Sequence, residues 1–182
     1  ACEFKEIIIN TDSEEIAIET KKHFNVTIHE RPKEICGDLV SMNDVIANDL
    51  NNYPTDQIFL QTHSTNPILK KETLISSYDK LINSPKNDSA FSVNRHQSRF
   101  YNHLGNAVNH NPDLLIRTQD LNPLYEENSC FYYFSKNSFC KKNNRIGNQP
   151  LMIETNYFES IDLDESWQWA LAEEVFRQGM NK

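Results

Sequence analysis

The first thirty residues alternate a strand, a helix and a second strand, and this alternation limits the fold more than any other feature. Segment 6–10 (Glu-Ile-Ile-Ile-Asn) is a β-branched run typical of a strand buried on both faces. Asp12 or Ser13 can cap a helix that is predicted to end near His23. Segment 26–29 is the next predicted strand. Two strands joined through a helix form a β-α-β unit, so the sequence predicts an α/β fold with a mostly parallel sheet.

Predicted strands and helices continue to the end of the sequence. The further predicted helices are 41–50, 70–82 and 165–177, and the further predicted strands are 57–61, 88–95, 99–104, 130–134 and 150–154. Segment 130–134 (Cys-Phe-Tyr-Tyr-Phe) is apolar throughout, which indicates a buried strand. Gly105 and Asn106 indicate a turn after 99–104. With 182 residues, the chain has the length of one domain with its own core, so we expect residues 1–182 to form a single domain.

Charge and cysteine content exclude several classes of protein. A net charge of −8 and a pI near 5.2 argue against a nucleic-acid partner, because phosphate backbones are bound by clustered Lys and Arg. No apolar run approaches the roughly 20 residues that cross a bilayer, and the N-terminus lacks the pattern of a signal peptide, so no membrane partner is expected. The cysteines Cys2, Cys36, Cys130 and Cys140 show no Cys-x-x-Cys spacing. Neither a zinc site nor a disulfide scaffold is therefore predicted, and a reducing, cytoplasmic location fits best.

A polar stretch at 117–129 leads directly into the apolar strand 130–134. It contains Arg117, Gln119, Tyr125 and Asn128. A guanidinium donates two parallel hydrogen bonds to a carboxylate, and amides hydrogen-bond to hydroxyls. Such a set of side chains can therefore bind a sugar acid when a rigid strand positions it. The alternative interpretation is a surface loop of solvated side chains, which the composition alone favours.

Polar residues also occur at two predicted strand-to-helix junctions. Open α/β sheets bind ligands beyond the carboxyl ends of their strands, so Gln61 and the loop to Asn66 are expected at the mouth of a site. Asp162 and Asp164 point the same way on an extended segment, because side chains two residues apart share a face. Their oxygens suit a Mg²⁺ ion that also holds a triphosphate. The alternative is that Asp164 only caps the helix that follows.

Five motifs occur in a fixed order along the chain. They are T-D-S-E-E at 11–15, R-P at 31–32, L-Q-T-H-S-T-N-P at 60–67, R-T-Q-D-L-N-P-L-Y-E-E-N-S at 117–129 and S-I-D-L-D at 160–164. In this order they resemble the acylneuraminate cytidylyltransferases, the CMP-sialic acid synthetase-like enzymes. The resemblance extends from about residue 6 to residue 176 and is carried mainly by the motif at 117–129.

The resemblance implies a fold, a reaction and a set of site residues. The fold is a three-layer, Rossmann-like nucleotidyltransferase with a β excursion at about 95–115 that completes the partner's site in a homodimer. In the reaction, the 2-hydroxyl of a nonulosonic (sialic-type) acid attacks the α-phosphate of CTP and releases pyrophosphate. The resemblance implies Mg²⁺ binding and catalysis for Asp162 and Asp164, and the binding of a carboxylate or phosphate during catalysis for Arg117. It implies substrate binding for Gln61, Thr65, Gln119, Tyr125 and Asn128, and nucleotide binding for Arg31 and Asp12. His63 departs from the family pattern and is given no role.

The sequence also departs from the family in one larger feature. Family members begin with a strand and a basic, Gly-rich loop whose backbone N–H groups hold the triphosphate, and no segment here matches that loop. The expectation is a fragment, a truncated gene product or a chain without triphosphate chemistry. Two alternatives to a sialic-type synthetase follow: a non-catalytic module that binds a nucleotide sugar or a sugar acid, and a related octulosonate cytidylyltransferase. The segment 64–67 (Ser-Thr-Asn-Pro) is closer to the neuraminate type.

Overall fold

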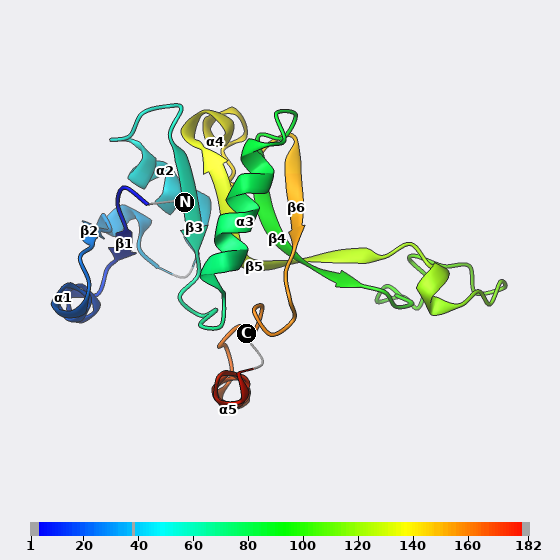
Figure 1. The fold of residues 1–182 in the computed structure, drawn as a ribbon. Coiled ribbons are helices and arrows are strands. Elements are labelled where there is room, and N and C mark those ends of the chain that lie inside the picture. Colours follow the sequence, from blue (N-terminus) through cyan, green and yellow to red (C-terminus); the bar gives the residue numbers. More distant parts are fainter. Residues whose placement is uncertain (1–3, 38, 180–182) are drawn as a thin grey trace.

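The chain forms a four-stranded sheet, a two-stranded sheet beside it and a long arm (Figure 1). The computed structural model describes residues 4–37 and 39–179. Within these ranges, helices cover the larger sheet, and the arm extends from the ends of its two central strands, away from the smaller sheet (Figure 1). The arrangement confirms the predicted α/β class.

The smaller sheet is the β-α-β unit predicted from the first thirty residues. Strand β1 (Ile8–Thr11) pairs in parallel with β2 (Thr27–Glu30), and α1 (Glu14–His23) connects them. Ser13 caps α1, because its hydroxyl accepts a hydrogen bond from the backbone N–H of Ile16 at 3.3 Å. Of the two cap residues that the sequence allowed, the structure therefore selects Ser13 over Asp12.

The larger sheet has the strand order β3-β5-β4-β6. Its strands are β3 (Ile58–Thr62), β4 (Ser89–His96), β5 (Leu124–Ser135) and β6 (Pro150–Glu154). Strand β4 is parallel to β6, whereas β5 is antiparallel to both of its neighbours. Strand β5 follows β4 through the arm and not through a helical crossover, so it returns in the opposite direction. The prediction of a mostly parallel sheet thus needs this one correction.

Helices lie on both faces of the larger sheet and make three layers. On one face, α3 (Lys71–Ile82) packs on a core cluster formed by Leu81, Ala90, Cys130, Phe131, Tyr133 and Ile153. On the other face, α2 (Met42–Leu50) and α4 (Lys136–Lys142) contribute to a cluster formed by Ile46, Leu50, Tyr132, Phe134 and Phe139. The three layers and helices α2 and α3 were predicted, whereas α4 was not.

A bulge divides β5 into a polar half and an apolar half. The register between β4 and β5 shifts between Phe91 and Val93, and Ser129 adopts the left-handed conformation with φ of 59°. Ser92 closes the bulge: its hydroxyl accepts from the Phe131 backbone N–H at 3.0 Å and lies 3.3 Å from the Phe131 carbonyl oxygen. The polar half of β5 therefore turns away from the core at this point.

The side chain of Asn128 connects the same bulge to β4 and to the residue that follows β6. Its amide nitrogen donates to Asn94 Oδ1 at 2.9 Å and to Thr155 Oγ1 at 2.7 Å. Its amide oxygen accepts from the Cys130 backbone N–H at 3.4 Å. The whole amide is thus engaged within the protein.

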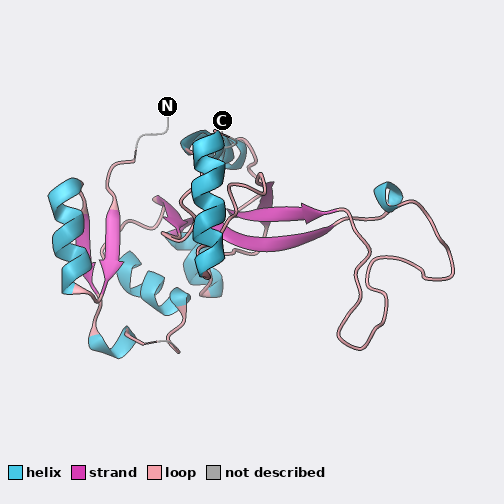
Figure 2. Cartoon of the chain, turned by 90° about the horizontal axis from the view of Figure 1, so that it is seen from below, coloured by secondary structure: helices cyan, strands magenta, loops and turns pink. Residues whose placement is uncertain are grey.

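The arm comprises residues 97–123 and the outer parts of β4 and β5, and it projects from the body (Figure 2). It contains the short helix η2 (Thr118–Asp120). The predicted strand 99–104 is wrong: among the described residues, only an isolated bridge joins Tyr101 to Ala107. Asn102 explains the difference, because its side-chain oxygen accepts from the backbone N–H groups of Leu104 and Asn106 and forms the predicted turn instead.

Two further helices complete the described chain. Helix η1 (Lys33–Ile35) follows β2, and α5 (Ser166–Gln178) packs on Ile68 through Ala172 and Val175. Glu165, not Asp164, is the N-terminal cap of α5 and forms a capping box with Gln168. The interpretation of Asp164 as a helix cap is therefore wrong. In the described part of the chain, no helix combines the length and apolarity needed to cross a membrane.

We predict that Gly147→Ala destabilises the fold. A Cβ atom at Gly147 would lie 2.3 Å from Asp88 Oδ1, and the Asp88 carboxylate accepts from the backbone N–H groups of Asn148 and Gln149. The displaced carboxylate would lose these bonds, at a cost of about 1–3 kcal/mol in the free energy of unfolding. Urea denaturation measures this cost.

The double variant with Asp88→Ala tests the cause. If the contact is responsible, adding Gly147→Ala to Asp88→Ala costs much less than it does in the wild type. If the losses in the free energy of unfolding caused by the two substitutions are simply additive, the explanation is contradicted.

Candidate active site at the carboxyl end of β3

Two polar segments that are distant in the sequence meet beyond β3. The loop after β3 and the segment before α5 are joined by a backbone hydrogen bond of 3.0 Å from Leu163 N to Thr65 O. The side-chain amide of Asn66 also donates to the Ile161 carbonyl oxygen at 3.2 Å. Thr65 and Asp162 were predicted to share a site, and the structure brings their segments together at the expected end of the strand.

Asp162 has the chemistry of a cation ligand. Its Oδ1 atom is buried and has no hydrogen-bond partner among the described residues, which is a costly state for a carboxylate oxygen. Asp164, two residues on, is exposed. Within the described chain, no cluster of three or more His, Cys, Asp or Glu side chains could hold a metal. A Mg²⁺ ion held by these two carboxylates would need further ligands, such as phosphate oxygens and water.

Gln61, His63 and Arg145 form a hydrogen-bonded group beside this junction. Arg145 Nη1 donates to Gln61 Oε1 at 2.8 Å and lies 3.3 Å from His63 Nε2. The Gln61 amide nitrogen lies 3.1 Å from the same His63 nitrogen. Because both neighbours are donors, His63 Nε2 must accept, and the imidazole proton is on Nδ1.

The surroundings of His63 favour this neutral form. Burial lowers the pKa of His63 below its ordinary value of 6.5, and the positive charge of Arg145 lowers it further, while Asp162 acts in the opposite direction. Protonation of His63 Nε2 would turn this acceptor into a third donor that faces the donors of Arg145 and Gln61. The group is therefore arranged for a neutral histidine at neutral pH.

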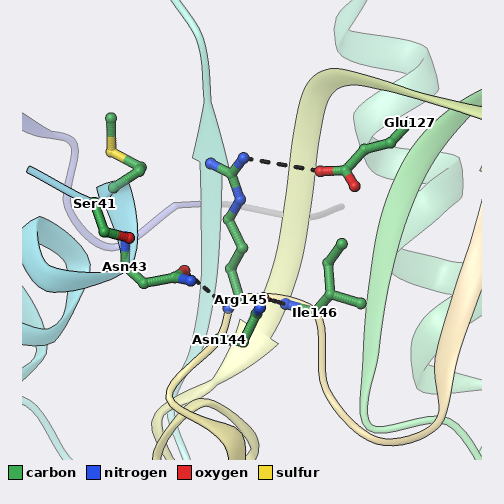
Figure 3. Close-up of a pocket in the computed structure, with 7 residues that line it drawn as sticks. Ser41, Asn43, Glu127, Asn144, Arg145 and Ile146 are labelled. Atoms are coloured by element: carbon green, nitrogen blue, oxygen red, sulfur yellow. Dashed lines mark hydrogen bonds and ion pairs between the residues drawn. The ribbon is translucent and has the colours of Figure 1, made fainter. Parts of the chain in front are cut away.

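Arg145 also contacts Tyr132 and faces a small pocket. Its guanidinium carbon lies 3.7 Å from the centre of the Tyr132 ring, and Nη2 donates to the Tyr132 hydroxyl at 3.0 Å. Burial and the hydrogen bond to Glu127 raise the pKa of Tyr132 to about 12, so the hydroxyl stays protonated. The pocket, shown in Figure 3, has a volume of about 220 Å³ and is lined by Ser41, Met42, Asn43, Glu127, Asn144, Arg145 and Ile146.

Sequence reasoning missed Arg145 and Tyr132. From the sequence, the Asn-Arg-Ile-Gly segment at 144–147 predicts only a turn, and Tyr132 belongs to the predicted buried strand 130–134. The signal that was present is an arginine two residues before a glycine, in a turn that follows a buried strand. By itself it does not reveal that the turn folds back on β3 and β5.

The predicted nucleotide residues lie on the smaller sheet. Arg31 Nε donates to Asn10 Oδ1 at 2.9 Å, and the Asn10 amide nitrogen donates to both Asp49 oxygens at 2.8 and 3.0 Å. His29 Nδ1 lies 2.8 Å from Asp49 Oδ1. These bonds fix the orientation of Arg31 at the carboxyl ends of β1 and β2. Asp12 is exposed beside them.

Arg117, Gln119 and Tyr125 belong to the arm, which extends away from β3 of the same chain (Figure 1). The side chain of Arg117 is 73% exposed and donates to Asp120 at 2.8 and 3.2 Å. Gln119 is exposed, and Tyr125 is 39% exposed. A single chain therefore does not unite these three with Gln61, Thr65 and Asp162. Asn128 lies near the junction, but its amide is engaged in holding the β5 bulge.

Comparisons with known proteins bear on the fold and the family of this chain. In fold, the chain is similar to 4-diphosphocytidyl-2C-methyl-D-erythritolsynthase from Anaerococcus prevotii DSM 20548, with 12% identity, a TM-score of 0.65, and coverage of 94% of this chain and 81% of that one. HddC from Yersinia pseudotuberculosis is also 12% identical, with a TM-score of 0.47 and coverage of 93% and 76%. Among curated proteins, none has a sequence that matches. A family model described as cytidylyltransferase matches residues 1–177, so the chain belongs to the cytidylyltransferase family.

Proposed function

We propose that this chain activates a nonulosonic, sialic-type acid with CTP to give the CMP-sugar and pyrophosphate. The acid's 2-hydroxyl forms a bond to the α-phosphorus, the bond to the pyrophosphate oxygen breaks, and the hydroxyl proton is released. Membership of the cytidylyltransferase family supports the use of CTP. The resemblance of the motifs at 60–67, 117–129 and 160–164 to the acylneuraminate enzymes supports the acid as acceptor.

One observation carries the proposal: the hydrogen bond from Leu163 N to Thr65 O, which joins the predicted acceptor loop to the predicted metal segment. Asp162 and Asp164 would hold Mg²⁺, which neutralises phosphate charge when bound. Gln61 and Thr65 would orient the sugar at the same junction. Such phosphoryl transfer depends mainly on positioning and charge neutralisation, and this junction supplies groups for both.

The proposal includes a homodimer in which the arm of one copy reaches the site of the other. Arg117, Gln119 and Tyr125 belong to the arm, which extends away from β3 of their own chain (Figure 1). A second copy would let them meet a sugar held by Gln61. A cytoplasmic location belongs to the same proposal, because CTP is made there and the free thiols of Cys36, Cys130 and Cys140 persist in a reducing compartment.

We predict that Asp164→Ala lowers turnover at least about a hundredfold, because a metal ligand contributes several kcal/mol to transition-state stabilisation and each 1.4 kcal/mol is roughly tenfold. The exposed side chain of Asp164 makes a loss of folding unexpected. The measurement is pyrophosphate release from CTP with Mg²⁺ and a panel of nonulosonic acids. Asp56→Ala, at an exposed position in the loop before β3, is the matched control.

Turnover of Asp164→Ala that equals the wild type at saturating Mg²⁺ would refute the metal assignment. Wild-type chain that binds an acid of the panel but releases no pyrophosphate would show a sugar-binding module without transferase activity.

We also predict a loss of activity at acidic pH. The pKa of His63 is lowered from 6.5, so the site stays intact at pH 7 to 8 and fails only as the pH falls through the lowered value. The same protonation is linked to folding: the unfolded chain binds this proton more readily, so the free energy of unfolding also decreases as the pH falls below 6.5.

The kcat/KM for the acid, measured from pH 5 to 8 and corrected for the folded fraction, tests this prediction. His63→Gln keeps an acceptor oxygen without the titration and should remove the acidic decline. An identical pH profile in that variant would contradict the assignment.

A further inference from the structure

Arg145 is a largely buried cation whose charge is incompletely neutralised. Its side chain is only 16% exposed. Among the described residues, its ion-pair partner is Glu127, whose carboxylate oxygen lies 3.9 Å from Nη2, too far for a hydrogen bond (Figure 3). Glu127 is 44% exposed and accepts a hydrogen bond from the Tyr132 hydroxyl instead. A buried charge without a bonded counter-ion is costly, so its retention calls for an explanation.

The loop that carries Arg145 is built to hold it in place. The Arg145 backbone N–H donates to Asn43 Oδ1 at 3.3 Å, and the next residue's N–H donates to Asn144 Oδ1 at 2.8 Å. After it, the Gly147 N–H donates to Ser89 Oγ at 2.9 Å. Bonds to α2 and β4 thus fix the loop from two sides. A side chain fixed in this way loses little entropy when it binds a ligand.

The contacts of the guanidinium leave donors unused. Arginine has five N–H donors, and the described contacts engage Nη1 with Gln61 and His63 and one Nη2 proton with Tyr132. The Nε proton and the second Nη2 proton remain. Both remaining protons can donate to the oxygens of a carboxylate, the group that a guanidinium binds best.

The pocket beside Arg145 fits the head of such a ligand. Figure 3 shows the guanidinium pointing toward Glu127 of β5, while the side chain of Asn43 of α2 lies beside the Arg145 backbone. The volume of about 220 Å³ is smaller than the roughly 300–1,000 Å³ of pockets that enclose a whole drug-sized molecule. It therefore has room for a carboxylate with its neighbouring atoms, and the rest of the ligand would lie outside the pocket.

We infer that Arg145 binds the C1 carboxylate of the acceptor and thereby selects a sugar acid over a neutral sugar. This inference rests on the proposed function and adds a residue to which no role had been assigned. Arg117, the arginine expected from the motif at 117–129, is exposed on the arm and paired with Asp120. Arg145 is an arginine that lies close to Gln61 of the same chain. Gln61 and His63 both contact Nη1 of its guanidinium.

The test compares the binding of an acid with that of its C1 carboxamide. Calorimetry is carried out on the whole chain with N-acetylneuraminate, legionaminate and pseudaminate, and with the carboxamide of whichever binds most tightly. The wild type should prefer the acid by roughly tenfold to a hundredfold, the effect of one or two charge-assisted hydrogen bonds. Arg145→Met should reduce this preference to about twofold or less, and Arg145→Lys, which keeps the charge but not the paired N–H groups of arginine, should retain part of it.

The controls separate this inference from the proposed function. Arg177→Met, at an exposed position on α5, should keep the wild-type preference. Wild-type preference in both Arg145 variants would overturn the inference, as would its loss in Arg117→Met alone. Both outcomes leave the proposed function standing. A wild-type chain that binds no acid of the panel would contradict both the inference and the function. If Arg145→Met does not fold, the test depends on Arg145→Lys. A wild-type ratio of acid affinity to carboxamide affinity in Arg145→Lys would exclude recognition by the paired N–H groups of arginine.

Discussion

The structure depends on the burial of the apolar half of β5 between two layers of helices. Phe131 and Tyr133 face α3, and Tyr132 and Phe134 face α2 and α4. The strand lies between β3 and β4, so its backbone is also paired on both edges. Burial of large aromatic side chains at about 25 cal/mol per Å² is the dominant favourable contribution that such a small core can make. Tyr132 connects this core to the candidate site, because its buried ring packs against Arg145 and its hydroxyl accepts a hydrogen bond from it.

The bulge in β5 turns one long strand into two functional parts. Ser129 takes a left-handed conformation, and the Asn128 amide bonds to Asn94 and Thr155 across the sheet. Before the bulge, the strand belongs to the arm; after it, the strand belongs to the core. The polar motif at 117–129 therefore ends at the boundary between the two. This explains why residues of one motif occupy such different surroundings, with Arg117 exposed and Asn128 engaged.

Local patterns predicted most elements of the fold, and long-range pairing accounts for the differences. The β-branched run at 6–10 and the serine caps at Ser13 and Ser41 are local signals, and the structure has β1, α1 and α2 where they indicate. Helix α4 has only seven residues and begins at a capping box of Ser135 and Ser138, which is too short for a helical period to appear. The antiparallel direction of β5 depends on the path of the arm, which no local pattern records. The candidate site divides in the same way. The strand-end rule predicted the loop from Gln61 to Asn66 at the site, and the family resemblance added Asp162, whereas Arg145 reaches Gln61 only because a loop folds back across the sheet.

The central claim is that the junction of the β3 loop with segment 161–164 transfers the cytidylyl group of CTP to a sugar acid. The most direct measurement is ³¹P NMR of the chain with CTP, Mg²⁺ and each nonulosonic acid in turn. The account predicts that, with one of the acids, the CTP signals are replaced by pyrophosphate and a phosphodiester in equal amounts. CTP that remains unchanged with every acid, or pyrophosphate that appears without a phosphodiester, would contradict it.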